Sequence, residues 1–377
     1  MSQNTSEDSE NLFFKKLLPL TKLIEQLGDI EKENVKLPKI CVLGNYSSGK
    51  SSILESLIDL DIIPRGDGRV TRRPLELNFN HIYSGQDYAI FDEKKDIKFT
   101  DFKKLKDTIE QLTNDVTINN RKISTKPIIL NIYSRECPDL TLIDLPGLER
   151  IDIGFAPKNI EQIGHIIAQK YIQDPSTIIL CVIPANSDIF TSDALRMAKD
   201  IDDSGERTIG VLTKLDIMDQ GTDVRKDLLN EGIPLKLGYI GIKNRSKQDL
   251  VKNISMKETK LNEKEFFKTH PKYNDLSSEL LGIDSLINKL IKLYLKMVKD
   301  NCPMIIDVIN EKKKKVEKEL DDLSQIISLM QVNIKDEEKK TKEEKEKEKE
   351  DPAKQGSNNK KNFMVIYLDK IFKYLYN

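Results

Sequence analysis

The sequence predicts an α/β fold, with a mostly parallel sheet flanked by helices and an α-helical segment towards the C-terminus. Short apolar runs bounded by turn residues are typical of buried strands, and longer amphipathic stretches between them are typical of helices. Their alternation indicates strand–helix–strand units around one sheet. The expected strands are Ile40–Leu43, Leu140–Ile143, Ile178–Ile183, Thr208–Leu212 and Tyr239–Ile242, and the expected helices between them include Ser51–Leu60, Asn159–Tyr171 and Ser192–Asp202.

Helices are also expected on both sides of this alternating region. Before it, apolar residues recur at helical spacing, and Pro19 lies near the expected first turn, where its missing N–H costs little. Beyond Gly282 the strand-like runs stop, and a longer helix is expected to end near Pro303. The apolar positions are Leu17, Leu20, Leu23, Ile24 and Leu27 in the first helix, and Leu286, Ile287, Leu290, Leu293, Tyr294, Met297 and Val298 in the second.

The last part of the chain has a different pattern. Apolar residues at alternating steps of four and three predict a helix that packs on another helix. Lys335–Asp351 is almost wholly Lys and Glu, which indicates a solvated helix or a flexible insert, and a last helical pattern covers Phe363–Tyr376. The alternating steps join Val316, Leu320, Leu323, Ile327 and Met330.

Composition excludes several classes of function. A chain of 377 residues exceeds the usual size of one hydrophobic core, and Lys+Arg 61 against Asp+Glu 62 leaves no global field that would attract nucleic acid. The polar, acidic start and the lack of an apolar run of ~18 residues predict neither secretion nor a membrane span. Widely separated cysteines without CxxC spacing predict reduced, structural thiols and a cytosolic compartment. They are Cys41, Cys137, Cys181 and Cys302.

The strongest motif is a candidate phosphate loop. Gly44–Ser51 reads GNYSSGKS, which matches GxxxxGK[ST] directly after an expected strand and at the start of an expected helix. In such a loop, backbone N–H groups surround phosphate oxygens at a helix N-terminus. Lys50 would reach the β- and γ-phosphates, and the Ser51 hydroxyl would ligate Mg²⁺. The alternative is a Gly/Ser-rich turn with a solvated lysine, which the flanking strand and helix disfavour.

A second motif, Asp144-Leu145-Pro146-Gly147, stands at the end of the expected strand Leu140–Ile143. There, Asp144 can hold a water molecule of Mg²⁺, and the Gly147 N–H can approach a γ-phosphate. The motif alone could be a strand-ending turn, since Pro and Gly are common in turns for steric reasons. Its place after the phosphate loop favours the nucleotide interpretation.

A third motif, Thr213-Lys214-Leu215-Asp216, follows the expected strand Thr208–Leu212 and points to guanine. The Asp216 carboxylate can accept hydrogen bonds from N1–H and from the exocyclic amine of guanine, whereas adenine offers neither donor in that arrangement. A carboxylate left unpaired in a binding site is costly, so such a site should reject the wrong base strongly. Lys214 would lay its aliphatic stem along the ring plane.

These motifs lie within longer runs that strongly resemble the dynamin superfamily, and the likeness covers about residues 17 to 330. Several blocks in the same order are far more specific than a phosphate loop alone. The runs are LPKICVLGNYSSGKSSILESL, PRGDGRVTRRPLEL, LIDLPGLER, IPANSDIFTSDAL, RTIGVLTKLDIMDQGTD and LGYIGIKNRS.

The resemblance implies four segments. They are a disordered tail and N-terminal bundle helix over 1–36, a GTPase domain with an extended sheet over 37–282, a C-terminal bundle helix over 283–302, and a partial helical middle or stalk region over 303–377. The last segment would contain the charged insert at 335–361. Pro303 would be the hinge between bundle and stalk, and the full protein would be longer, cytoplasmic and peripheral to membranes that it remodels or divides.

The resemblance also implies residue roles that spacing alone does not give. Thr71, in the first switch segment, would be a second Mg²⁺ ligand and help position the attacking water. Ser47 and the carbonyls of Gly66 and Gly68 would hold a monovalent cation, K⁺ or Na⁺, which supplies positive charge in the transition state. The expected catalytic residues are Ser47, Lys50, Thr71, Gly147 and Asp188, and the expected Mg²⁺ ligands are Ser51, Thr71 and Asp144.

Asp188 and Asp219 would act across a dimer of GTPase domains, so that hydrolysis requires pairing, with higher assembly through the stalk. Asn244 and Arg245 match the family's fifth nucleotide motif, near the purine. The expected nucleotide-binding residues are Gly44, Asn45, Ser47, Ser48, Gly49, Lys50, Ser51, Ser52, Arg65, Gly66, Gly68, Thr213, Lys214, Asp216, Asp219, Asn244, Arg245 and Ser246.

Two departures from the family pattern bear on activity. Tyr46 stands where the family usually has glutamine or another polar residue that orients water, which puts the efficiency of hydrolysis in question but not binding. Lys247 and Gln248 are exchanged relative to the usual order, which could alter contacts to the base or to a dimer partner.

Two other functions remain open at this point. One is a scaffold that binds GTP and assembles but barely hydrolyses it. The other is a phosphate-loop ATPase or small-molecule kinase, which Asp216 opposes. Nucleic acid is not expected to be a partner, and membrane contact is expected only through parts of the whole protein outside this sequence.

Overall fold

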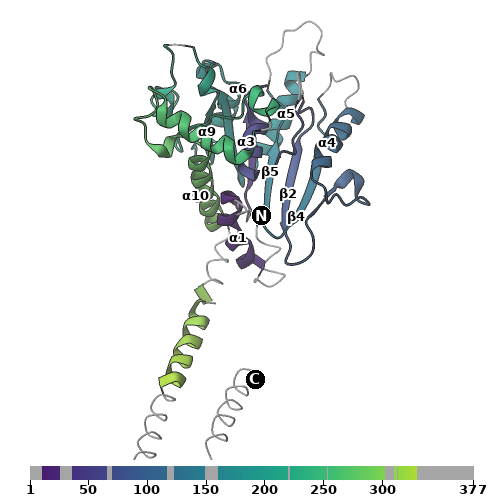
Figure 1. The fold of residues 1–377 in the computed structure, drawn as a ribbon, viewed down its shortest axis with the longest axis vertical. Helices are drawn as coiled ribbons and strands as arrows, with labels where there is room; N and C mark the ends of the chain where they lie inside the picture. The colour runs from purple at the N-terminus through teal and green to yellow at the C-terminus, as the bar shows by residue number, and fades with distance from the viewer. Residues whose placement is uncertain are drawn as a thin grey trace, which may run out of the picture. The chain divides into compact units, whose positions relative to one another are not determined.

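The computed structural model describes residues 11–25, 36–65, 70–116, 123–148, 160–219, 221–252, 254–301, 310–311 and 313–328. The chain divides into two units, Met1–Val308 and Ile309–Asn377. The first holds a sheet of eight strands covered by helices (Figure 1). The second, in its described part, is helical. Within these ranges, no helix is both long and apolar enough to cross a membrane.

The strand order in the sheet is β3-β4-β2-β5-β1-β6-β7-β8. β1 lies near the middle and pairs in parallel with β5 and β6, and β6-β7 and β7-β8 are also parallel. The predicted mostly parallel α/β sheet is therefore confirmed. The strands are β1 (Lys39–Gly44), β2 (Leu75–His81), β3 (Tyr88–Phe91), β4 (Ile128–Ser134), β5 (Leu140–Asp144), β6 (Thr177–Pro184), β7 (Thr208–Thr213) and β8 (Tyr239–Gly241).

Three of these strands were not expected from the sequence: β2, β3 and β4, which extend the sheet on one side. β2 and β4 alternate buried and partly exposed residues along LELNFNH and IILNIYS. A strand with one partly solvated face has this alternation, so a search for compact apolar runs passes over it. β2 pairs in parallel with β4 and antiparallel with β5.

Helices pack on the central strands of the sheet. α3 contacts β1, β5, α1 and α10, whereas α5 and α6 pack on each other and on β1 and β6. The α-helices are α1 (Leu12–Glu25), α3 (Lys50–Ile58), α4 (Lys103–Val116), α5 (Ile160–Ile172), α6 (Asp193–Ile201), α7 (Arg225–Leu228), α8 (Lys247–Val251), α9 (Met256–Thr269) and α10 (Ile283–Asn301).

The described cysteines lie inside the fold, as the sequence predicts. Cys41 and Cys181 belong to the apolar cluster beneath α5 and α6, and Cys137 is buried near His81. Burial raises the pKa of all three thiols, and that of Cys137 to about 12. These thiols are therefore protonated and unreactive at neutral pH. Cys302 lies outside the described residues.

α1 and α10 lie side by side (Figure 1). Lys16 Nζ donates to Asn288 Oδ1 at 2.6 Å across this contact. The prediction for Pro19 was wrong: α1 begins at Leu12, so Pro19 lies in mid-helix rather than near the first turn. Phe13 and Phe14 are buried, and the burial of these two side chains offsets the lost backbone hydrogen bond and the ring clash that a proline causes inside a helix.

The two later helices differ in burial. α10 covers Ile283–Asn301, and its expected apolar face is buried. Residues 313–328 are helical as predicted, but Val316, Leu320, Leu323 and Ile327 are exposed. Packing of that helix on another helix stays a prediction, as do the four segment boundaries. Met330, the insert at 335–361 and the pattern at Phe363–Tyr376 lie outside the described residues.

Candidate nucleotide site

The sheet topology brings the sequence motifs to one edge. β1, β5, β6, β7 and β8 run parallel, so their carboxyl ends meet there, and open α/β sheets bind ligands at that edge. β2 runs antiparallel to β5, with Leu75 opposite Asp144. The segment before β2 therefore delivers Thr71 to the same edge.

The phosphate loop and the Asp144–Gly147 motif are joined through their backbones. Tyr46 N donates to Leu148 O at 3.1 Å, and Leu148 N donates to Gly44 O at 3.1 Å. A Cβ atom added at Gly147 would lie 2.7 Å from the Cα and N atoms of Tyr46, which is too close for any side chain. Glycine is therefore needed for the second motif to lie against the phosphate loop.

Lys50 is buried at the base of this loop. α3 begins at Lys50, directly after Gly49, whose φ of 100° favours glycine. Lys50 Nζ donates to the carbonyls of Asn45 at 3.0 Å and Gly44 at 3.2 Å. An ammonium group and the N-terminus of a nine-residue helix thus face the same loop, and both favour an anion.

Three oxygen-bearing side chains converge on the end of β5. Ser51 Oγ donates to Asp144 Oδ2 at 2.8 Å, and Thr71 Oγ1 donates to the same atom at 3.2 Å. Asp144 is fully buried, and its Oδ1 has no hydrogen-bond partner. Burial raises the pKa of this carboxyl group, against the opposing effects of Lys50 and the two hydroxyl groups.

These side chains fit a magnesium ion. Mg²⁺ prefers oxygen ligands and is usually held by one or two carboxylates, hydroxyl groups, water and substrate phosphates. An orphaned buried carboxylate oxygen beside two hydroxyl groups is the arrangement that a hard cation would satisfy. Ser51, Thr71 and Asp144 would hold the ion directly or through its water.

The base motifs also pack against the phosphate loop. Thr213 Oγ1 donates to Ser48 O at 2.6 Å, and a Cβ atom added at Gly49 would lie 2.8 Å from Asn244 Nδ2. Lys214 has a φ of 62°, a left-handed backbone that turns the chain sharply between β7 and Asp216. Asp216 is exposed, and the side-chain oxygen of Asn244 is buried without a partner.

Some residues that were expected to contact the nucleotide interact with other protein groups in this structure. Arg65 forms an ion pair with Glu55, and Arg245 Nη2 lies 3.5 Å from the same carboxylate and 3.9 Å from Asp61. Ser246 caps α8: it accepts from Asp249 N and donates to Asp249 Oδ2 at 2.8 Å. In this conformation, Arg65 and Arg245 are therefore directed towards Glu55.

Sequence reasoning missed Glu55. It lies on α3, is fully buried, and accepts from Ile63 N at 3.1 Å at the start of the segment that leads to Arg65. Burial raises the pKa of Glu55 to about 7, although Arg65 opposes the shift. The sequence did hold one indication of this burial, because Glu55 lies among the apolar residues Leu54, Leu57 and Ile58 in the predicted helix.

The remaining predicted residues are more dispersed. Ser47 is exposed on the phosphate loop with a φ of 56°, and Ser52 is partly buried in α3. Asp188 and Asp219 are exposed, and Asp188 caps a short 3₁₀ helix by accepting from Phe190 N at 3.0 Å. Gly66 and Gly68 lie outside the described residues.

The fold and this site define a phosphate-loop nucleotide-binding protein. A model of the dynamin family matches residues 40–215, and a model of the dynamin central region matches residues 223–360. The chain belongs to the dynamin superfamily of large GTPases.

Curated relatives agree with this assignment. Dynamin-2 of Bos taurus is 41% identical over 315 residues, which cover 83% of this chain and 36% of the relative. Dynamin-A of Dictyostelium discoideum is 40% identical over 294 residues, or 76% and 34% of the two chains. Dynamin-related protein 3B of Arabidopsis thaliana is 40% identical over 298 residues, or 77% and 38%. The chain thus spans about a third of the length of these relatives.

Proposed function

We propose that this chain binds GTP with Mg²⁺ and hydrolyses it to GDP and phosphate. The observation that carries the proposal is the convergence of Lys50, Ser51, Thr71 and Asp144 at one edge of the sheet. Membership of the dynamin superfamily supports the same activity.

Each group at this edge has a chemical task in the proposal. The phosphate-loop N–H groups and Lys50 bind the β- and γ-phosphates, while Gly147 leaves room for its N–H to approach the γ-phosphate. Mg²⁺, when bound through Ser51, Thr71 and Asp144, supplies positive charge beside the phosphates. Positioning and electrostatic stabilisation account for most of the catalysis in phosphoryl transfer.

The guanine base would be recognised on the other side of the phosphate loop. Asp216 would accept from the guanine N1–H and amino groups, and Lys214 would lie along the ring. The Asn244 side chain lies against Gly49 through its Nδ2 atom, and its buried oxygen, which has no hydrogen-bond partner, supports a ligand at this place. Arg65 and Arg245 would leave Glu55 if they contact the nucleotide, and Ser246 would contribute backbone groups.

Full activity would also need a monovalent cation and a second copy of the domain. Ser47, Gly66 and Gly68 would hold K⁺ or Na⁺, and the exposed Asp188 and Asp219 would contact the partner. Exposure of these side chains supports an intermolecular role. Further assembly through the helical segment, and remodelling or division of membranes, are proposals for the whole protein.

A GTP-gated assembly scaffold with very low hydrolysis is the second candidate function. Tyr46 favours it, because its aromatic side chain is 41% exposed on the phosphate loop where the family resemblance places a water-orienting polar residue. Binding groups are unaffected by Tyr46, so turnover alone separates the two functions.

The test is the rate of GTP hydrolysis per molecule against protein concentration, in K⁺ and Mg²⁺ buffer with ATP as a competitor. Lys50→Ala is the blank. A specific rate that climbs with concentration, falls when K⁺ is replaced by choline and vanishes in the blank supports hydrolysis coupled to pairing. Negligible turnover with selective GTP binding would favour the scaffold.

A further inference from the structure

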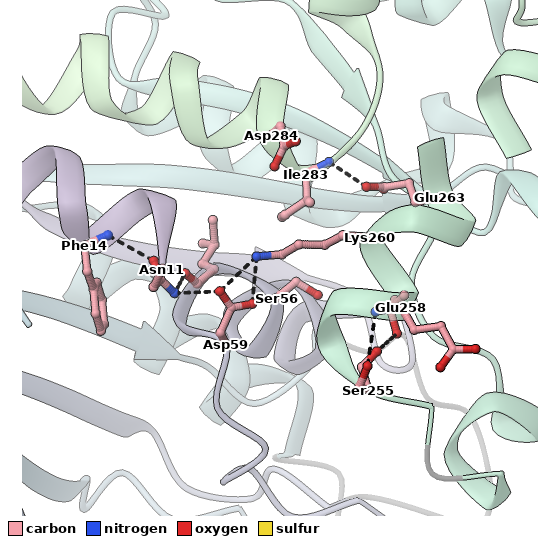
Figure 2. A network of polar contacts seen from close by, with 12 residues as sticks. Asn11, Phe14, Ser56, Asp59, Ser255, Glu258, Lys260, Glu263, Ile283 and Asp284 are labelled. Carbon is pink, nitrogen blue, oxygen red and sulfur yellow. Dashed lines mark hydrogen bonds and ion pairs between the residues drawn. The ribbon is translucent and has the colours of Figure 1, made fainter. Parts of the chain in front are cut away.

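One buried carboxylate on α9 joins the loop after β8, which carries Asn244, to the start of α10. Glu263 is 3% exposed, and each of its oxygens accepts one backbone hydrogen bond. Lys243 N donates to Oε1 at 3.0 Å, and Ile283 N donates to Oε2 at 2.9 Å. Figure 2 shows the bond between Glu263 and Ile283 beside the neighbouring polar contacts of α9.

The two donors belong to different parts of the fold. Lys243 directly precedes Asn244, whose amide group lies against Gly49 of the phosphate loop. Ile283 is the first residue of α10, where a backbone N–H has no partner within the helix. Capping of α10 alone would need only one acceptor, and a short polar side chain in the loop before the helix supplies that in most proteins.

Burying a carboxylate is costly unless its oxygens are satisfied. Glu263 meets this condition because each of its oxygens accepts a backbone hydrogen bond. One of the two donors, Lys243 N, belongs to the loop that carries Asn244. Glu263 lies in the middle of α9, and this helix is anchored because Ser255 caps its start and Lys260 Nζ lies 2.7 Å from Asp59 Oδ1. The carboxylate therefore has a fixed place from which to hold the loop.

We propose that Glu263 is a positioning residue for guanine binding, which fixes the loop carrying Asn244 and ties that loop to the start of α10. This rests on the proposed function, because the base site must exist for the loop to matter. Glu263 touches neither base nor phosphate in this role and acts through the backbone of Lys243.

The decisive variant is Glu263→Gln, which keeps the shape of the side chain but replaces one acceptor oxygen by an NH₂ group. One of the two N–H donors then loses its partner, and the loop is less well held. We expect KM for GTP to rise about tenfold with kcat little changed, as for the loss of a binding contact of typical strength. The preference for GTP over ATP should fall by a similar factor.

Lys260→Met is the matched control on the same helix. Lys260 links α9 to Asp59 at the end of α3, where Asn11 Nδ2 also donates to Asp59 Oδ2 at 3.1 Å (Figure 2). The substitution removes this anchor of α9 but no contact to the base loop. It should lower Tm, while KM and the GTP/ATP preference stay at the parent values.

The outcomes separate the roles. A raised KM and a reduced GTP/ATP preference in Glu263→Gln alone support the proposal. Parent values in Glu263→Gln, or equal losses of preference in both variants, would overturn it, since the effect would then be absent or a general loosening of α9. A parent protein with no preference for GTP would instead refute the guanine site itself.

Amide hydrogen exchange on the unaltered protein gives a second measurement that does not depend on the variants folding. If Glu263 links the two segments, GDP binding should slow exchange at Ile283 as well as at Lys243. Unchanged exchange at Ile283 in saturating GDP would show that the carboxylate does not tie the loop to α10.

Discussion

Asp144 combines complete burial with an oxygen that has no hydrogen-bond partner, and burial raises its pKa. Without a bound metal ion, the buried negative charge of Asp144 lowers the stability of the folded protein. Asp144→Asn keeps the shape and one acceptor for Ser51 and Thr71. We expect the nucleotide-free protein to be unchanged or stabilised by about 1 kcal/mol, and Mg²⁺ no longer to strengthen GDP binding.

Thermal melts with and without GDP, each with Mg²⁺ or EDTA, would check this prediction. The parent should gain Tm from GDP mainly when Mg²⁺ is present. A variant that loses several kcal/mol of stability before any ligand is added would mean that Asp144 is held for the fold and not for a cation.

Gly147 is limited by contact rather than by charge. The backbone atoms of Tyr46 would lie 2.7 Å from an added Cβ atom, so Gly147→Ala must separate the two loops. We expect hydrolysis to fall about a hundredfold, because displacement of reacting groups by about 1 Å has effects of that order. GDP binding should be nearly kept, because Lys50 and the base motifs are unaltered.

Gly164→Ala on α5 is the matched control for this prediction. A Cβ atom there would lie 3.9 Å from Gly147 O, an ordinary distance, and alanine favours a helix. The control should therefore keep parental turnover and be equally or more stable. Equal losses of turnover in both variants would contradict the steric explanation.

The site residues predicted from sequence alone lie in continuous motifs. Gly44–Ser51 and Thr213–Asp216 could be predicted because their spacing along the chain is the spacing that would surround a phosphate or a base. Glu55 and Glu263 were missed because a buried charged residue in a helix has the same local pattern as an exposed one. Only the distant donors or acceptors distinguish them, and those contacts depend on the fold.

Among elements, the strands that were found are those buried on both faces. β1, β5, β6, β7 and β8 are short and continuously apolar or nearly so, and they form the parallel part of the sheet. β2 and β4 were missed because they carry polar residues on one face. Pro19 was misplaced because packing of Phe13 and Phe14 against the rest of the fold extends α1 towards the N-terminus. Burial by distant elements decided these cases, and local propensity did not.

Arg73 joins several elements on the side of the sheet that was not predicted. Its side chain is fully buried and donates to Leu112 O at 2.6 Å at the end of α4, and to Lys126 O and Pro127 O at 2.9 Å before β4. It also pairs with Glu93. Arg73→Met would leave these acceptors without their donor, so we expect a loss of about 3–5 kcal/mol of unfolding free energy.

Urea denaturation would measure this loss, with Arg196→Met as the control. Arg196 pairs with Asp193 on α6 but is 63% exposed, so its removal should cost at most about 1 kcal/mol. Similar small losses in both variants would show that the acceptors around Arg73 find water or other partners.

The stability of the whole domain should depend on pH in a direction set by its buried carboxylates. Burial raises the pKa of both Glu55 and Glu263 from the ordinary 4.5 of a glutamate to about 7. Between those values, the native protein binds protons that the unfolded chain does not. The stabilisation from this difference is complete below about pH 4.5 and is lost as pH rises through 7.

From pH 6 to pH 8, the unfolding free energy should therefore fall by roughly 1 kcal/mol for each of the two groups. The raised pKa of Asp144 acts in the same direction, while His270 opposes it, because partial burial lowers its pKa. Urea titrations of the nucleotide-free protein at both pH values measure the change. Glu263→Gln should remove about half of the contribution of the two glutamates, and a parent protein that is more stable at pH 8 would contradict the burial of these charges.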